Sequence, residues 1–88
     1  MGLEFYNIET GENLFIIMDN EISNFDSYFN VFNEKYNDFI DIYGDFRLHK
    51  NHLEFLKGLI SNAVMMVKFG NMIDMCIQED ITIIVKGN

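Results

Sequence analysis

The sequence predicts a single α+β domain, residues 1–88, in which a small sheet with an N-terminal hairpin and a C-terminal strand is packed by two to three helices. Three observations predict this fold class. Two short apolar runs near the N-terminus flank a polar link with a glycine, three later apolar series recur at helical spacing, and a β-branched run lies near the C-terminus. With 49% hydrophobic residues in 88, the chain is long enough for one core and too apolar to be disordered.

The two N-terminal runs, Leu3–Ile8 and Asn13–Met18, predict a β-hairpin, because the four residues between them are Glu-Thr-Gly-Glu. In the first run Leu3 and Phe5 alternate with more polar residues, so one face of that strand is expected to point inward. The second run is apolar at every position from Leu14 to Met18. We therefore expect this strand to be covered on both faces, as a central strand is.

Residues 19–24 are expected to form a polar turn, and the apolar residues after it predict a helix. Their steps of 4, 3, 4 and 3 are helical, and they are Phe25, Phe29, Phe32, Tyr36 and Phe39. This side of the helix is expected to face the core. The opposite side carries a hydrated stripe of carboxylates and amides, namely Asp26, Asn30, Asn33, Glu34, Asn37 and Asp38.

The second half of the chain predicts further helices and a final strand. Residues 39–43 alternate apolar with acidic, so they form either a short strand or an extended lead into the next helix. A helix is expected from about Lys50, and residues 64–67 either continue it or begin a third helix that ends near Gln78. The β-branched run Ile81–Val85 predicts the last strand.

The charge of the chain is acidic and unevenly distributed. Fourteen acidic and six basic residues give a formal net charge of −8. Residues 1–45 hold ten acidic residues and one lysine, a net charge of −9, whereas residues 46–88 hold four acidic and five basic residues. Such a field repels phosphate backbones and attracts cationic surfaces, so we expect no direct nucleic-acid binding and a protein partner with a basic surface. Acidity for solubility alone is the alternative interpretation.

We expect the partner to contact the carboxylates of this first half. The first helix uses its apolar side for the core, so its acidic residues emerge on the other side, and further acidic residues precede and follow it. The predicted partner-binding residues are Asp19, Glu21, Asp26, Glu34, Asp38, Asp41 and Asp45.

The sequence contains no motif that points to catalysis, and neither an enzyme nor a cofactor is expected. Asp45, His49 and His52 have a spacing that presents three metal ligands on a helical path, so a metal-binding enzyme or sensor is the alternative of another class. Two solvated histidines at the start of a helix are the simpler interpretation. Cys76 shares an apolar helical face with Phe69 and Met72 and is expected to be a buried, unreactive thiol.

The sequence also predicts the location of the protein. A single cysteine excludes an internal disulfide and fits a reducing compartment. No apolar stretch approaches the roughly 18 to 20 residues of a membrane-spanning helix, and Met1–Glu4 lacks the basic region of a signal peptide. We expect a cytoplasmic protein without membrane contact.

Gly44 and Arg47 are expected to shape the start of the second helix. Gly44 permits a turn with a backbone conformation that other residues do not readily adopt. Arg47 is expected to reach back to Asp41 or Asp45 and to fix this turn, with a partner contact as the alternative.

The segment Ile40–Leu48 reads Ile-Asp-Ile-Tyr-Gly-Asp-Phe-Arg-Leu. It resembles the I-D-x-Y-G-D-x-R-L segment of small cytoplasmic immunity-type proteins, which neutralise bacterial toxins. A final helix and an apolar strand ending in Gly87-Asn88 extend the resemblance over roughly the second half of the chain, although an aspartate would be expected where Asn88 stands. The resemblance implies an immunity protein that covers a basic active or nucleic-acid-binding surface of a toxin. A phage-encoded inhibitor of host defence, such as an anti-CRISPR protein that mimics the charge of DNA, would look the same at this level.

Overall fold

The computed structural model describes residues 2–37, 39–41, 43–61 and 63–87, and it confirms the α+β class. In these residues, four strands form one antiparallel sheet in the order β2-β1-β4-β3. The strands are β1 Gly2–Asn7, β2 Asn13–Met18, β3 Asp45–Leu48 and β4 Ile83–Gly87. The helices are α1 Asp26–Tyr36, α2 Lys50–Ile60 and α3 Val67–Gln78, and short 3-10 helices, η1 Asp19–Phe25 and η2 Val64–Met66, lead into α1 and α3.

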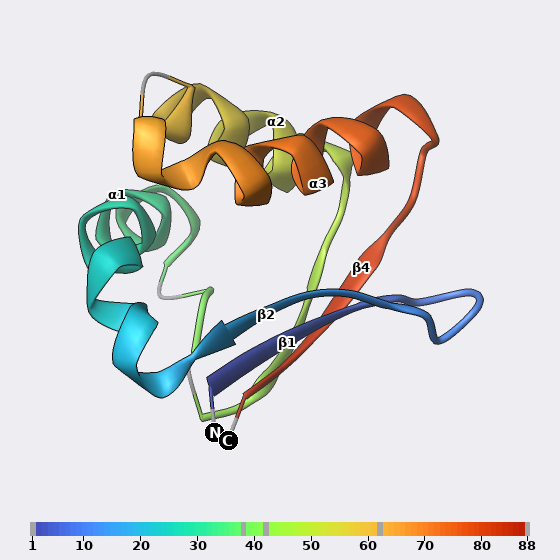
Figure 1. Cartoon of the computed structure of the whole chain (residues 1–88), viewed down its shortest axis with the longest axis horizontal. Helices are drawn as coiled ribbons and strands as arrows, with labels where there is room; N and C mark the ends of the chain where they lie inside the picture. The colour runs from blue at the N-terminus through green and yellow to red at the C-terminus, as the bar shows by residue number, and fades with distance from the viewer. Residues whose placement is uncertain (1, 38, 42, 62, 88) are drawn as a thin grey trace.

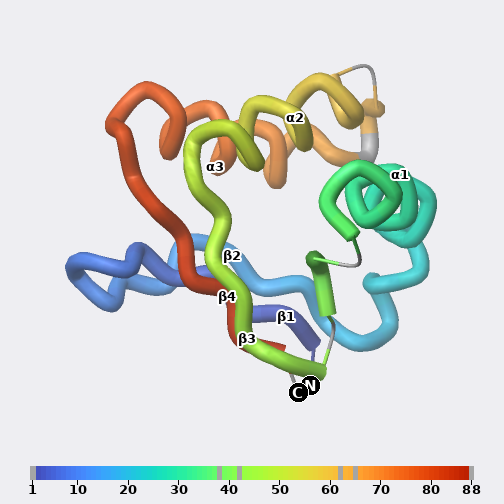
Figure 2. Tube along the Cα trace, turned by 180° about the vertical axis from the view of Figure 1, so that it is seen from behind, coloured from blue at the N-terminus to red at the C-terminus, as the bar shows by residue number. Residues whose placement is uncertain are grey.

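The sheet and the helices form two layers (Figure 1). Helices α2 and α3 pack against each other over one face of the sheet, and α1 lies toward the end of the sheet where both chain termini are found, as Figure 2 shows from behind. Every strand turns alternate residues toward the helices. The buried residues on this inner face are Leu3, Phe5, Ile17, Phe46, Leu48, Ile83 and Val85.

Phe69 of α3 joins the helical layer to the N-terminal half of the sheet. Its ring centroid lies 5.5 Å from that of Phe5 in β1 and 5.3 Å from that of Phe15 in β2. The ring of Phe25, the last residue of η1, lies 5.1 Å away and nearly perpendicular. Edge-to-face rings at such distances add a favourable interaction energy to that of apolar burial. This cluster therefore holds β1, β2 and η1 against α3.

The predicted hairpin is confirmed, but the predicted cover on both faces of β2 is wrong. The turn closes through a 2.9 Å hydrogen bond from the N–H of Asn7 to the carbonyl oxygen of Glu12. Because β4 pairs with the other side of β1, β2 lies at the edge of the sheet. On the face away from the helices, the side chains of Ile16 and Met18 are 45% and 50% exposed.

The first helix is confirmed, with different ends. Residues 19–24 belong to η1 rather than to an irregular turn. Helix α1 ends at Tyr36 because Asn37 adopts a left-handed conformation with φ of 57°, which terminates a helix. Phe39 therefore lies beyond the helix, although its ring still packs near that of Phe46, with centroids 5.9 Å apart.

Asn33 does not belong to a hydrated stripe, which corrects the prediction. Its side-chain oxygen accepts the N–H of Ile40 at 2.7 Å, and its side-chain nitrogen donates to the carbonyl oxygen of Ile40 at 3.0 Å. Both backbone groups of Ile40 are thus satisfied by an amide side chain, as they would be by a neighbouring strand. The described residues of segment 39–43 form no strand, and the unpredicted strand β3 begins only at Asp45.

The remaining elements follow the sequence closely. Helix α2 begins at Lys50 as predicted, residues 64–67 begin a new helical segment, and α3 ends at Gln78. The final strand is confirmed, shifted to Ile83–Gly87. None of the helices in the described residues is long and apolar enough to cross a membrane.

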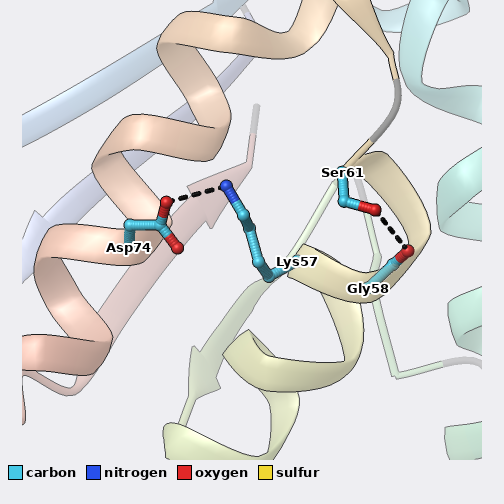
Figure 3. Close-up of polar contacts among 4 residues, drawn as sticks. All are labelled: Lys57, Gly58, Ser61 and Asp74. Atoms are coloured by element: carbon cyan, nitrogen blue, oxygen red, sulfur yellow. Dashed lines mark hydrogen bonds and ion pairs between the residues drawn. The ribbon is translucent and has the colours of Figure 1, made fainter.

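Helices α2 and α3 are also joined by a polar contact, which Figure 3 shows. Nζ of Lys57 lies 2.7 Å from Oδ2 of Asp74. At the end of α2, the hydroxyl of Ser61 donates to the carbonyl oxygen of Gly58 at 3.3 Å. Both side chains of the ion pair are partly exposed, so the pair orients the two helices more than it stabilises the fold.

Candidate protein-binding surface

Six of the seven predicted partner-binding carboxylates lie in the described residues, and all six are exposed: Asp19, Glu21, Asp26, Glu34, Asp41 and Asp45. We call these six residues the acidic end. The seventh, Asp38, lies outside the described residues.

The acidic end lies mainly where β2 ends and β3 begins. Neighbouring strands run in opposite directions, so Asp19, directly after β2, and Asp45, at the start of β3, stand at the same end of the sheet. Three strand spacings, roughly 14 Å, separate these two strands. Glu21 and Asp26 follow in η1 and α1, and Asp41 lies in the segment before β3. Both chain termini mark this end in Figures 1 and 2.

Helix α1 carries two of these carboxylates on its exposed side. Asp26, Asn30 and Glu34 follow at four-residue steps and are all exposed, whereas Phe29 and Phe32 are buried. Eight residues of helix place Asp26 and Glu34 roughly 12 Å apart along the axis. The helix therefore carries the acidic end over roughly 12 Å of its exposed side.

Two members of the acidic end also hold the backbone around them. Oε1 of Glu21 accepts the N–H of Met18 at 3.0 Å, where β2 passes into η1. Oδ1 of Asp41 accepts the N–H of Tyr43 at 2.9 Å, and the carbonyl oxygen of Asp41 accepts the N–H of Gly44 at 3.2 Å. A turn forms at Gly44, as predicted, but its backbone is not closed to other residues, because Gly44 does not have a positive φ. The carboxylates of Glu21 and Asp41 are oriented by the turns they form.

An apolar groove of about 460 Å³ opens beside the free edge of β2, and we call it the β2 groove. It lies between the inner face of β2, η1 and the start of α3. Its charged lining residues are Glu21 and Lys68, and its apolar lining includes Phe15, Ile17, Phe25, Val64 and Val67. Val64 and Val67 are 86% and 55% exposed, so part of the lining is open to solvent. No local pattern in the sequence marks this groove, because it depends on how β2 and α3 meet.

The face of the sheet away from the helices is mixed rather than uniformly acidic. The register aligns Glu4 of β1, Lys86 of β4 and Asp45 of β3 in one row. The hydroxyl of Tyr6 donates to Oε1 of Glu4 at 2.6 Å, and Nζ of Lys86 lies 5.6 Å from the centre of the Tyr6 ring. The hydrogen bond to Glu4 raises the pKa of Tyr6. These residues therefore already engage one another.

The prediction of two solvated histidines is wrong for His52, which is only 9% exposed. Its ring stacks on that of Phe39 with centroids 4.6 Å apart, and its Nδ1 accepts the backbone N–H of His49 at 3.0 Å. Burial lowers the pKa of His52, and the nearby His49 lowers it further. His49 is exposed, as predicted.

The structure does not bring together the three residues proposed as metal ligands. Asp45 begins a strand, and the four residue-to-residue steps of extended backbone from Asp45 to His49 span roughly 13 Å, whereas the metal hypothesis assumed a helical path. Across the described residues, no three His, Cys, Asp or Glu side chains gather in a way that could hold a metal ion.

The predicted pair between Arg47 and Asp41 or Asp45 is also wrong. No ion pair joins Arg47 to either carboxylate, all three residues being described. The register of β3 places Arg47 opposite Ile84 and Asp45 opposite Lys86, so the strand is fixed by its ladder with β4. Arg47 is exposed on the outer face of this edge strand.

Cys76 is buried, as the sequence predicts. Its Sγ lies 3.9 Å from Sδ of Met72, on the same face of α3. Burial, and secondarily the charge of Glu79, raises the pKa of Cys76 to about 11. A thiol in this state is a packing group rather than a nucleophile.

Comparisons of the chain with protein-family models, with curated proteins and with solved structures find no match.

Proposed function

We propose that the protein is a small acidic inhibitor that binds a basic surface of another protein. The observation that carries this proposal is the acidic end, where six exposed carboxylates lie on adjoining elements of a chain with a net charge of −8. Such a surface attracts cationic patches over several ångströms and repels phosphate. A nuclease or another nucleic-acid-binding protein offers a cationic patch of this kind.

We further propose that the inhibitor is an immunity protein that neutralises a toxin. The resemblance of Ile40–Leu48 to immunity-type proteins supports this form of the proposal. The same segment supplies Asp41 and Asp45 to the acidic end. The acidic end equally supports a phage-encoded inhibitor of host defence, and the identity of the bound protein separates the two.

Affinity capture from the source organism, followed by mass spectrometry, tests the proposal. The wild-type chain is expected to capture a protein with a basic surface that is released as salt is raised. The matched bait carries Asp26→Asn and Glu34→Gln, which remove two exposed charges of α1 and leave the buried side of the helix unchanged. Equal capture by the two baits, or capture of nucleic acid in place of protein, would refute the proposal.

A further inference from the structure

The two edges of the sheet differ in how well they are protected. The edge strand β3 has four residues and exposes Asp45 and Arg47, and a short, charged edge is a common defence against pairing with another chain. The opposite edge strand, β2, has six residues and no charge. Its exposed face carries Ile16 and Met18. The β3 edge is therefore protected against pairing with another strand, and the β2 edge is not.

The free side of β2 also offers backbone hydrogen-bonding groups. In an antiparallel pair, every second residue directs its N–H and C=O away from its partner strand. The N–H of Met18 is bound by the carboxylate of Glu21 rather than by β1, so the alternation places the N–H and C=O of Ile16 on the free side. No described strand pairs there. The bulge in the pairing with β1 leaves Phe15–Met18 as the regular stretch.

An added strand would find apolar surface on both of its faces. Side chains that point inward would enter the β2 groove, beside Phe15 and Val67. Side chains that point outward would lie against Ile16 and Met18, on the face opposite the helices. The apolar sequence of β2 from Leu14 to Met18 is typical of a central strand, and a fifth strand would make β2 a central strand.

We propose that β2 and the β2 groove bind an extended segment of a protein partner, which adds to the sheet as a fifth strand. Alternate apolar side chains of this segment enter the groove, and lysine or arginine residues flank it. Part of this inference rests on the proposed function, since that function makes the partner basic.

The charges beside β2 favour such a segment over a second copy of this chain. Glu12 precedes the strand and Glu21 follows it. Antiparallel pairing of two β2 strands would bring the Glu12 end of one copy to the Glu21 end of the other, where like charges repel. A segment with basic flanks meets opposite charges at the same two places.

A synthetic peptide serves as the probe, because it carries the proposed features in a defined form. Its sequence is Lys-Arg-Val-Thr-Val-Thr-Val-Lys-Arg, in which valines point to one face of the added strand and threonines to the other. Titrated into the isotope-labelled full chain, it is expected to shift the amide signals of Phe15–Met18 and of Val67. A peptide with glutamate in place of each lysine and arginine is expected to bind at least about tenfold more weakly.

Two lysine variants test the edge itself. Ile16→Lys places a charge on the free edge, as β3 does naturally, and is expected to weaken binding of the basic peptide at least about tenfold. Ile84→Lys is the matched control, because Ile84 lies on the same outer face in a strand that is paired on both sides. A peptide N-methylated at its central residues blocks the backbone hydrogen bonds without any change to the protein, and it too is expected not to bind.

Several outcomes would overturn the inference. They are absence of peptide binding, unchanged binding to the Ile16→Lys variant, and signal shifts confined to α1. A dimer that Ile16→Lys dissociates would also overturn it, in favour of a second copy on this edge. If the peptide does not bind while neutral variants of Asp26 and Glu34 still lose the captured protein, this inference is wrong and the proposed function stands. If the peptide binds while those variants capture the protein as well as the wild type does, the strand site stands and the proposed function is wrong.

Discussion

The backbone N–H of His49 donates a 3.0 Å hydrogen bond to Nδ1 of His52 at the start of α2. Nδ1 accepts a hydrogen bond only while it carries no proton, so this contact fixes the protonation of that nitrogen. The ring is also packed, with its centroid 4.6 Å from that of Phe39 and 4.8 Å from that of Tyr36. His52 therefore belongs both to the cap of α2 and to the core.

Replacing His52 with alanine is expected to destabilise the fold by about 1 to 3 kcal/mol, because it removes ring packing and the acceptor for a backbone donor. Urea denaturation measures this free energy of unfolding. His49→Ala is the control, since it keeps the backbone N–H and changes an exposed side chain, and about 0.5 kcal/mol or less is expected. Equal losses in the two variants would contradict the assignment of His52 to the core.

The stability of the fold is expected to fall on acidification in a way that depends on His52. Its pKa in the folded protein lies below the ordinary value of 6.5, so the unfolded chain binds more protons. Its stabilising contribution is then complete above about pH 6.5 and is lost as the pH falls through the folded pKa. Thermal unfolding at about pH 7.5 and about pH 5.5 measures the loss, which should shrink in His52→Asn. If the loss of stability on acidification is unchanged in His52→Asn, other titrating groups cause it.

Phe69→Ala is expected to cost about 3 to 5 kcal/mol, because this ring is buried and contacts the rings of Phe5, Phe15 and Phe25. Phe69→Leu retains most of the volume and is expected to cost less than half as much. Denaturant unfolding of the two variants gives the comparison. Similar stability in Phe69→Ala and the wild type would mean that α3 is held to β2 and η1 by other contacts.

The Cys76 thiol is expected to resist alkylation in the folded protein. Burial raises its pKa to about 11, so only about one molecule in a thousand carries the thiolate at pH 8. Labelling followed by mass spectrometry should be slow in buffer and complete in denaturant. Rapid labelling in buffer would show that the end of α3 opens easily.

Elements with a local signal could be predicted from the sequence. The hairpin, α2, the end of α3 and the last strand follow from apolar spacing and from a glycine-containing link. Strand order has no such signal. The edge position of β2 is set by pairing between β1 and β4, whose residues lie at opposite ends of the chain. The apolar residues of β2 are visible in the sequence, but they predict a central strand, whereas β2 lies at the edge of the sheet.

The candidate surface, like the fold, could be predicted only where the sequence carries a local signal. The charges along the sequence place most carboxylates in the first half, and the exposure of Asp26 and Glu34 follows from the apolar side of α1. That Asp19 and Asp45 stand at one end of the sheet depends on strand order. The burial of His52 depends on the segment after α1, which Asn33 holds through both backbone groups of Ile40. Contacts of this kind leave no periodic pattern in the sequence, so residue spacing does not predict them.

Association kinetics with the captured partner test the central claim, that the acidic end guides the approach of a basic protein. Three forms are compared between about 50 and about 500 mM salt: the wild type, Asp26→Asn with Glu34→Gln, and Glu54→Gln with Glu79→Gln. The last pair is the control, because both residues are exposed and lie in the nearly neutral second half. Asp74 is not used, because it pairs with Lys57.

The wild-type association rate should fall steeply with salt, since electrostatic steering raises such rates by roughly 10- to 1000-fold and fades as ions screen it. Neutralising Asp26 and Glu34 should slow association severalfold at low salt and flatten its salt dependence, while the Glu54 and Glu79 control stays near the wild type. Equal effects of the two double variants, or a wild-type rate that does not change with salt, would contradict the claim and would assign the acidity to solubility alone.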